Sequence, residues 1–314
     1  MARRPRRWRP DAVYAEVKRT VDRQFLLKPT PEVRNIVGAC LARAQAKFPV
    51  KIYWAVANIN TMQLGRAPVD DHPDALDNMS RFDQLFYGLL SREINKLWDR
   101  EGPVWSTRNR SEECIDDRSV EQQLLYALTN PVKDGLCEKV SDWEGLTLFG
   151  QLAGGKEERF YHIDWVRWWN EGGKKNKKPL GEYKKWVTVK LSPIPEWERY
   201  REHERQTLLR KRVRQIENEC ARERKEANRP AMSKSMRARV DPRDRPRNKK
   251  ESGPQPLCHS STRESADEYK AGWRDFLERF REASAQFLSG VFEVEFPDGS
   301  FRPPLMTVCV ADST

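Results

Sequence analysis

Apolar residues near the start of the chain follow two different spacings. Alternating apolar and polar residues predict a strand within 12–27. Thr30 followed by Pro31 is a typical helix start, because threonine caps the first turn and proline fits inside it. Apolar residues at helical spacing extend this helix over 31–47. The segment 50–58 is rich in β-branched and aromatic residues and predicts a buried strand.

The following segments continue this alternation of strands and helices. A short strand is expected at 60–65, beside the buried strand. The clearest amphipathic spacing covers 79–99 and predicts a long helix with one apolar face. Polar stretches without regular spacing predict loops at 67–79 and 103–117.

A further helix is predicted at 118–130. A proline disfavours the helical conformation of the residue before it, so the pair Asn130 and Pro131 is expected to close this helix. The order of elements predicts an α+β fold over 12–150, with a small antiparallel sheet and helices packed on it.

The second half of the chain has a different character. Residues 151–194 form a basic connecting region with clustered tryptophans and lysines. Helical spacing returns in 195–229 and 263–289, so we expect a mainly helical C-terminal extension over 195–314. Proline, arginine and lysine dominate 228–258, which predicts a linker inside that extension.

The composition indicates a folded protein without a membrane span. The chain has 314 residues, 38% of them hydrophobic, with 11 Trp, 12 Phe and 8 Tyr, which is enough for a sizeable core. It contains neither a long apolar run nor a secretory signal pattern. The six cysteines include no CxxC pair, which argues against a zinc ribbon or a disulfide framework. We therefore expect a cytoplasmic protein, associated with the nucleoid if its partner is DNA.

The net charge of +11 favours a polyanionic partner. Nucleic acid is the first such partner. A membrane surface, and a basic protein with no polyanion partner, are the alternatives. Residues 1–11 carry five arginines and predict a flexible basic arm, which either lies along phosphates or stays solvated.

Basic side chains gather in clusters that suit contacts to DNA phosphates. The first cluster is the N-terminal arm: Arg3, Arg4, Arg6, Arg7 and Arg9. The second lies in a glycine-flanked loop: Lys174, Lys175, Lys177 and Lys178. The third lies in the linker: Arg237, Arg239, Arg243, Arg245, Arg247, Lys249 and Lys250. Arg110 and Lys133 are further candidates. Trp105 and Arg108 lie in a loop, where the tryptophan either stacks on bases or is buried.

One tyrosine is distinguished by the residues on its C-terminal side. Tyr126 precedes the segment NPVKDGL, which begins at Asn130, and the segment SDWEGL comes next. Together with FLL at 25–27 and VWSTRNR at 104–110, this ordered set resembles the single-tyrosine HUH transposases, most closely the REP-associated tyrosine transposases. The resemblance covers about 12–150 and implies an HUH-type, ferredoxin-like catalytic domain. It extends through LSPIPEW and FPDGSFRPPL to the longer members of the family, which have a C-terminal extension.

The resemblance also implies a chemistry. In that family a tyrosine attacks a DNA phosphodiester to give a 5′-phosphotyrosine intermediate, and Mg²⁺ or Mn²⁺ held by two histidines polarises the phosphate. It makes Tyr126 the nucleophile and Asn130 a further metal ligand. The histidine places fall on Ile59 and Thr61, which we expect to share one face of a strand. Isoleucine offers no donor atom, so we expect a degenerate site that does not bind metal in the family manner.

These observations leave two main functions open. The first is a transposase that cleaves and rejoins single-stranded or hairpin DNA through Tyr126. The second is a domesticated, non-catalytic DNA-binding or regulatory protein in which Tyr126 is structural. RNA or membrane-surface binding is a third alternative, and the resemblance allows a homodimer. The acidic loop around His72 is expected to be solvated rather than to hold a cation.

Overall fold

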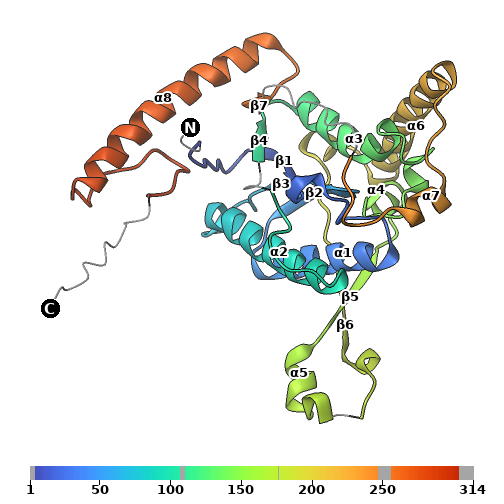
Figure 1. Ribbon diagram of the computed structural model, residues 1–314. Helices are drawn as coiled ribbons and strands as arrows, with labels where there is room; N and C mark the ends of the chain where they lie inside the picture. Colours follow the sequence, from blue (N-terminus) through green and yellow to red (C-terminus); the bar gives the residue numbers. More distant parts are fainter. Residues whose placement is uncertain (1–3, 107–109, 176, 247–255, 304–314) are drawn as a thin grey trace.

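The computed structural model describes residues 4–106, 110–175, 177–246 and 256–303 (Figure 1). Its strands are β1 (Val13–Arg19), β2 (Lys51–Asn58), β3 (Thr61–Ala67), β4 (Arg110–Cys114), β5 (Arg159–Ile163), β6 (Lys184–Thr188) and β7 (Cys258–His259). Its α-helices are α1 (Pro31–Lys47), α2 (Ala75–Leu97), α3 (Asp117–Lys133), α4 (Phe149–Gly154), α5 (Trp165–Asn170), α6 (Glu202–Glu226), α7 (Lys234–Arg239) and α8 (Arg263–Leu288).

The central sheet has the strand order β2-β3-β1-β4-β7. The first four strands are antiparallel, whereas β7 joins β4 in parallel. The chain order β1, α1, β2, β3, α2, β4 with this strand order is the ferredoxin-like arrangement. Helices α1 and α2 cover one face and α3 covers the other (Figure 1). The predicted fold, a small antiparallel sheet with helices packed on it and a helical C-terminal part, is confirmed.

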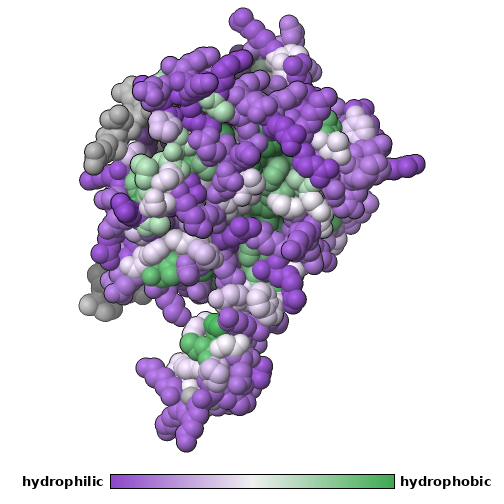
Figure 2. All heavy atoms as spheres, turned by 90° about the vertical axis from the view of Figure 1, so that its right-hand side faces the viewer, coloured by the Kyte–Doolittle hydropathy of each residue, from purple (hydrophilic) through white to green (hydrophobic). Residues whose placement is uncertain are grey.

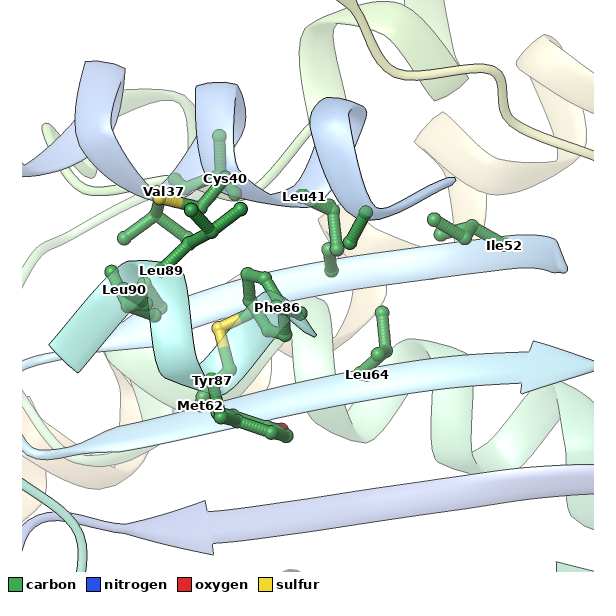
Figure 3. Close-up of a cluster of buried hydrophobic side chains, with 14 of the residues drawn as sticks. Val37, Cys40, Leu41, Ile52, Met62, Leu64, Phe86, Tyr87, Leu89 and Leu90 are labelled. Atoms are coloured by element: carbon green, nitrogen blue, oxygen red, sulfur yellow. The ribbon is translucent and has the colours of Figure 1, made fainter. Parts of the chain in front are cut away.

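The face toward α1 and α2 carries a dense hydrophobic core. Leu41 of α1 and Phe86 of α2 point toward the strands that carry Ile52 and Leu64, and all four side chains are fully buried (Figure 3). Burial of a side chain of this size stabilises a fold by about 1.5–3 kcal/mol. These side chains are closed to solvent and hold the strands against the two helices.

The opposite face is covered by α3 and by the C-terminal half of the chain. Trp54 and Val56 of β2 belong to one buried cluster with Leu128 of α3. Trp197 and Leu209, from the C-terminal half, belong to the same cluster. Helix α6 packs on α3 (Figure 1). Residues on both sides of the boundary expected near residue 150 therefore share one core.

A buried ionic cluster lies between the sheet and α2. The fully buried Arg66 guanidinium lies 2.7 Å from Glu16 Oε2 and 2.5 Å from Asp83 Oδ1. Tyr87 Oη donates a hydrogen bond to Glu16 Oε1, and Arg6 lies 3.3 Å from Asp83. Two carboxylates thus face two guanidinium groups, and the charges balance. We call these five residues the Arg66 cluster.

Three element boundaries differ from the sequence prediction. Strand β1 ends at Arg19 because Asp22 and Arg23 have φ angles of 50° and 58°, which no strand can continue through. Strand β4 lies within 103–117, where only a loop was expected. The strand was not predicted because its polar sequence RSEEC gives no strand signal. Helix α2 starts at Ala75, inside the loop expected before it.

The predicted end of α3 at the Asn130 and Pro131 pair was wrong. The helix continues to Lys133, so the missing amide donor of Pro131, two residues before the helix end, does not terminate it. The stop comes from Gly135, whose φ of 69° reverses the chain. The amide of Leu136 then donates to the Pro131 carbonyl at 2.8 Å, and that of Gly135 donates to the Val132 carbonyl at 3.0 Å.

The N-terminal residues pack against the domain rather than forming the expected flexible arm. Trp8 is only 1% exposed. The Arg9 guanidinium lies 2.8 Å from Glu113 Oε1, and the Arg7 guanidinium lies 4.8 Å from the ring centroid of Phe276 on α8. These arginines, like Arg6, therefore make internal contacts that hold the chain start in place.

The segment expected as a linker is partly folded onto the domain. It contains α7 and β7. The Arg237 side chain is 5% exposed and donates to the carbonyls of Leu136 and Asp142 at 2.8 and 3.3 Å. Arg237 therefore holds α7 against the loop after α3 and is a structural residue.

The helix predicted at 263–289 is confirmed as α8, which extends away from the sheet (Figure 1). Its apolar side buries Phe276 and Phe287. Across the described parts of the chain, every helix is too short or too polar to span a bilayer.

Candidate nucleic-acid interface around Tyr126

Tyr126 lies on the solvent-facing side of α3, at the edge of the apolar face that packs on the sheet. Its neighbours Ala127 and Leu128 are buried in the core beneath the helix, whereas Tyr126 itself is 46% exposed. Lys133, two turns further along, places its ammonium nitrogen 5.3 Å from the Tyr126 ring centroid. A large aromatic side chain is therefore held at the surface beside a cation.

Basic residues from three other segments meet at the same end of the sheet. Arg19 ends β1, Arg23 lies in the turn after it, and Arg110 begins β4 beside Val17 of β1. Burial lowers the pKa of Arg19, and the charges of Arg23 and Arg110 lower it further, whereas Tyr126 acts in the opposite direction. The pairing of Arg110 with Val17 puts Arg110 and Arg19 on the same face of the sheet, because Val17 and Arg19 are two residues apart on β1. We call Arg19, Arg23, Arg110, Lys133 and Tyr126 the Tyr126 surface.

The surroundings of Tyr126 keep its hydroxyl protonated at neutral pH. Burial raises the pKa of Tyr126, the Asp134 carboxylate raises it further, and Arg19 opposes both. Asp134 caps α3 and accepts a hydrogen bond from the Asn58 side chain at 3.1 Å. The hydroxyl is therefore not activated by a lowered pKa.

Ile59 and Thr61 do not share a face of one strand, contrary to the expectation from the sequence. Strand β2 ends at Asn58 and β3 begins at Thr61, so Ile59 lies in the two-residue turn between them. Ile59 is buried in the cluster that also contains Leu128 of α3. Thr61 pairs with Arg19 of β1, so this turn does lie next to the Tyr126 surface.

Hydrogen bonds tie the β2–β3 turn to the turn after β1. The Thr20 amide donates to the Asn60 carbonyl at 3.0 Å, and the Leu27 amide donates to the Ile59 carbonyl at 3.0 Å. The Asn60 side chain donates to the Arg23 carbonyl at 3.1 Å. The two turns thus form one rigid unit, which fixes Arg23 in its left-handed conformation.

The residues at this turn do not fit a divalent metal. Ile59 has no donor atom, and the Thr61 hydroxyl lies 3.0 Å from the Asn60 amide oxygen, to which it donates. Asn130 lies in α3, one turn after Tyr126, and is 8% exposed. Among the residues that the structure describes, no group of three or more His, Cys, Asp or Glu side chains is placed to hold a metal ion. The donor set that transition metals and Mg²⁺ prefer is missing here.

The other predicted contact residues are spread over the molecule. Arg110 and Lys133 belong to the Tyr126 surface. Arg4 is exposed. Trp105 is half-buried, its ring edge-on to Tyr87 with centroids 5.1 Å apart. Five candidates lie outside the described residues: Arg3, Arg108, Arg247, Lys249 and Lys250.

The sequence analysis did not predict two features: the arginines beside Tyr126 and the hairpin that carries the predicted lysines. Arg19 and Arg23 carry no motif, and only the end of β1 brings them to Tyr126. The predicted contacts Lys174, Lys175, Lys177 and Lys178 belong to a β-hairpin that was expected to be only a connecting region. The alternation in WVTV, within that region, was the one available strand signal.

Comparisons with known proteins give a limited likeness. No protein-family model matches the sequence, and no curated protein matches it. A structure of a REP-associated tyrosine transposase bound to a REP hairpin is similar at 18% identity and a TM-score of 0.39, over 49% of this chain and 87% of that one. A Deinococcus radiodurans protein assigned as a transposase is similar at 12% identity and a TM-score of 0.28, over 39% of this chain and 93% of that one. At these values neither structure carries an argument about the activity of this chain.

Proposed function

We propose that this protein is a transposase-like DNA-binding protein, and that the Tyr126 surface binds the phosphate backbone of single-stranded or hairpin DNA. The ordered motifs around Tyr126, which resemble those of REP-associated tyrosine transposases, support this function. The net charge of +11 supports a polyanionic partner independently.

The observation that carries the proposal is the excess of positive charge around Tyr126. Arg19, Arg23, Arg110 and Lys133 supply four basic groups. The acids beside them are Asp22, which precedes Arg23, and Asp134, which acts on the Tyr126 hydroxyl. Gathering like charges costs free energy, which a bound polyanion offsets. A guanidinium group can also donate two parallel hydrogen bonds to two oxygens of one phosphate.

DNA binding at this surface is proposed to be independent of metal. The residues in the two histidine places supply no ligand pair, so the cations that face the phosphate are side chains. A tightly bound Mg²⁺ or Mn²⁺ is therefore not part of the proposed site.

Strand cleavage by Tyr126 is a second candidate function. It is favoured by the exposure of the tyrosine beside Arg19, which could face a phosphate under attack. A labelled hairpin with unpaired flanks, incubated with Mn²⁺ and resolved under denaturing conditions, tests it. An adduct that disappears in Tyr126→Phe would establish the enzyme, and the absence of any adduct would leave binding alone.

Binding itself is tested by reversing charge on the Tyr126 surface. We expect Arg19→Glu combined with Lys133→Glu to weaken hairpin binding roughly 10- to 100-fold, since two phosphate contacts become repulsive. Arg92→Glu is the matched control, because Arg92 is an exposed arginine on α2, across the sheet from α3. Equal affinities of the double variant and the control would contradict the proposed site.

A further inference from the structure

A β-hairpin projects from the domain on the side away from α8. It consists of β5, α5 and β6 and extends below the sheet layers as a separate lobe (Figure 1). We call residues 159–188, other than 176, the arm; the basic N-terminal residues 1–11 are not part of it. Its contacts with the domain are made mainly by α1, which packs on β5 and β6, and by Lys96 of α2, whose ammonium nitrogen lies 4.2 Å from the Trp165 ring centroid.

The base of the arm is fixed rigidly on α1. Phe160 is 2% exposed and packs against Gly38 of α1. A Cβ atom added to Gly38 would lie 2.3 Å from the Phe160 ring, so the ring fits only because Gly38 has no side chain. The Asn35 side chain bonds both to the amide and to the carbonyl of Tyr161, at 2.9 and 3.0 Å. The arm is thus held in a set direction rather than tethered loosely.

One face of the hairpin alternates aromatic rings and cations. Tyr161 and Trp186 are cross-strand partners with ring centroids 5.4 Å apart. The Arg159 guanidinium lies 5.2 Å from the Trp186 centroid, and Lys184 Nζ lies 4.2 Å from the Tyr161 centroid. Trp186 is 52% exposed. This face, opposite to Phe160, presents π surfaces framed by positive charge.

The arm carries a large share of the positive charge of the chain. Its sequence has eight basic and three acidic residues, a net charge of +5 out of +11. One of the acids, Glu171, already pairs with Arg167 and Lys178 at 2.8 and 2.9 Å. Within the described residues, no acid forms an ion pair with four exposed lysines of the arm: Lys174, Lys175, Lys177 and Lys185. The lobe is accordingly hydrophilic over most of its surface, with a small apolar patch (Figure 2).

A purely structural role does not account for this face. A cross-strand aromatic pair stabilises a hairpin, but half of Trp186 remains in water. Exposed tryptophan among cations suits unpaired nucleobases, because every base has a π face and a phosphate beside it. A duplex hides its base faces, so this chemistry favours single strands.

We propose that the Tyr161–Trp186 face of the arm binds unpaired bases of single-stranded DNA by stacking, while the lysines of the arm contact the neighbouring phosphates. This inference rests on the proposed DNA-binding function and adds a second site to it. The Tyr126 surface holds one part of the DNA, and the arm holds a single-stranded segment that leaves it.

The test compares two fluorescent DNA hairpins, one blunt and one with an unpaired tail, by fluorescence anisotropy. We expect Trp186→Ala to weaken binding of the tailed hairpin on the order of 10-fold and to leave the blunt hairpin unchanged, because only the tail can stack. Trp186→Phe should recover part of the loss. Phe292→Ala, which removes a similarly exposed aromatic residue far along the chain, is the matched control.

The possible outcomes separate the two proposals. If the tailed hairpin binds Trp186→Ala and the wild type equally, the arm site is wrong. The same conclusion follows if both hairpins lose affinity to the same extent, or if an RNA tail or a vesicle with anionic lipids depends more strongly on Trp186. If the wild type binds neither hairpin, the proposed function fails as well. If DNA affinity falls in the double variant Arg19→Glu and Lys133→Glu but not in Trp186→Ala, the proposed function stands and the proposed site on the arm is wrong.

Discussion

The Arg66 cluster and the Tyr126 surface share strand β1, yet they differ in charge balance. In the Arg66 cluster, Glu16 and Asp83 match two guanidinium groups, and every member except the half-buried Arg6 is buried. At the Tyr126 surface, four basic groups stand against the acids Asp22 and Asp134, and the tyrosine is exposed. Balanced, buried charge is costly to disrupt, because removing one partner leaves the other unpaired away from water, whereas exposed like charges attract a partner of opposite charge.

This contrast predicts its largest effect at Arg66. We expect Arg66→Ala to lower the free energy of unfolding by about 3–5 kcal/mol, because it leaves buried carboxylates without their partner. Chemical denaturation measures the loss. Arg81→Ala, which breaks an exposed pair with Asp77, should change stability by less than about 0.5 kcal/mol. Similar losses in both variants would contradict the distinction between buried and exposed ion pairs.

The second effect concerns DNA affinity alone. The double variant Arg19→Glu and Lys133→Glu should lower the slope of log affinity against log salt by about 2, since each phosphate contact contributes nearly one unit. Its unfolding midpoint should stay at the wild-type value. A variant that unfolds more easily, or that keeps the full salt slope, would show that these cations belong to the fold.

The third effect tests whether the tied turns position Arg23. Asn60→Ala removes the hydrogen bond to the Arg23 carbonyl and should cost about 1 kcal/mol of stability. Because Arg23 is held at a positive φ, loss of this bond should also weaken DNA binding several-fold. Thr207→Ala on α6, which removes a hydroxyl bonded to the His203 carbonyl, is a control that should leave DNA affinity unchanged.

The smallest expected effect is a pH dependence of stability that arises from Glu113. Burial raises the pKa of this carboxyl, and Arg9 and a hydrogen bond from Tyr269 only partly oppose that. A raised pKa means that the folded protein holds a proton that the unfolded chain has lost, so stability falls as the pH rises above the ordinary glutamate pKa of about 4.3. Thermal melting between pH 4 and 7 should show this decline, and Glu113→Gln should not show it. A decline that persists in the variant would assign it to another group.

The fold was largely predictable, because its main elements carry strong periodic signals. The helix from Pro31 and the long α2 follow from apolar spacing. β4 was not predictable, since its glutamates form a strand only through their partners in the sheet. The end of α3 was misread because the signal of Gly135 was outweighed by that of Pro131.

The candidate site was only partly predictable. Tyr126 and Lys133 come from one motif, so the sequence points to them directly. Arg19 joins them only through the antiparallel pairing that sets it opposite Thr61. The expected geometry of Ile59 depends on where the β2–β3 turn falls, and a shift of a single residue in that turn changes which side chain faces outward.

The most direct test of the central claim compares DNA affinity with and without metal. Binding of a tailed hairpin is measured by anisotropy in EDTA and in Mn²⁺, for the wild type and for the double variant Arg19→Glu and Lys133→Glu. We predict equal wild-type affinity in both buffers and a loss of roughly 10-fold or more in the double variant in both. Wild-type binding that requires Mn²⁺, or that survives the double charge reversal, would contradict a metal-independent phosphate site at Tyr126.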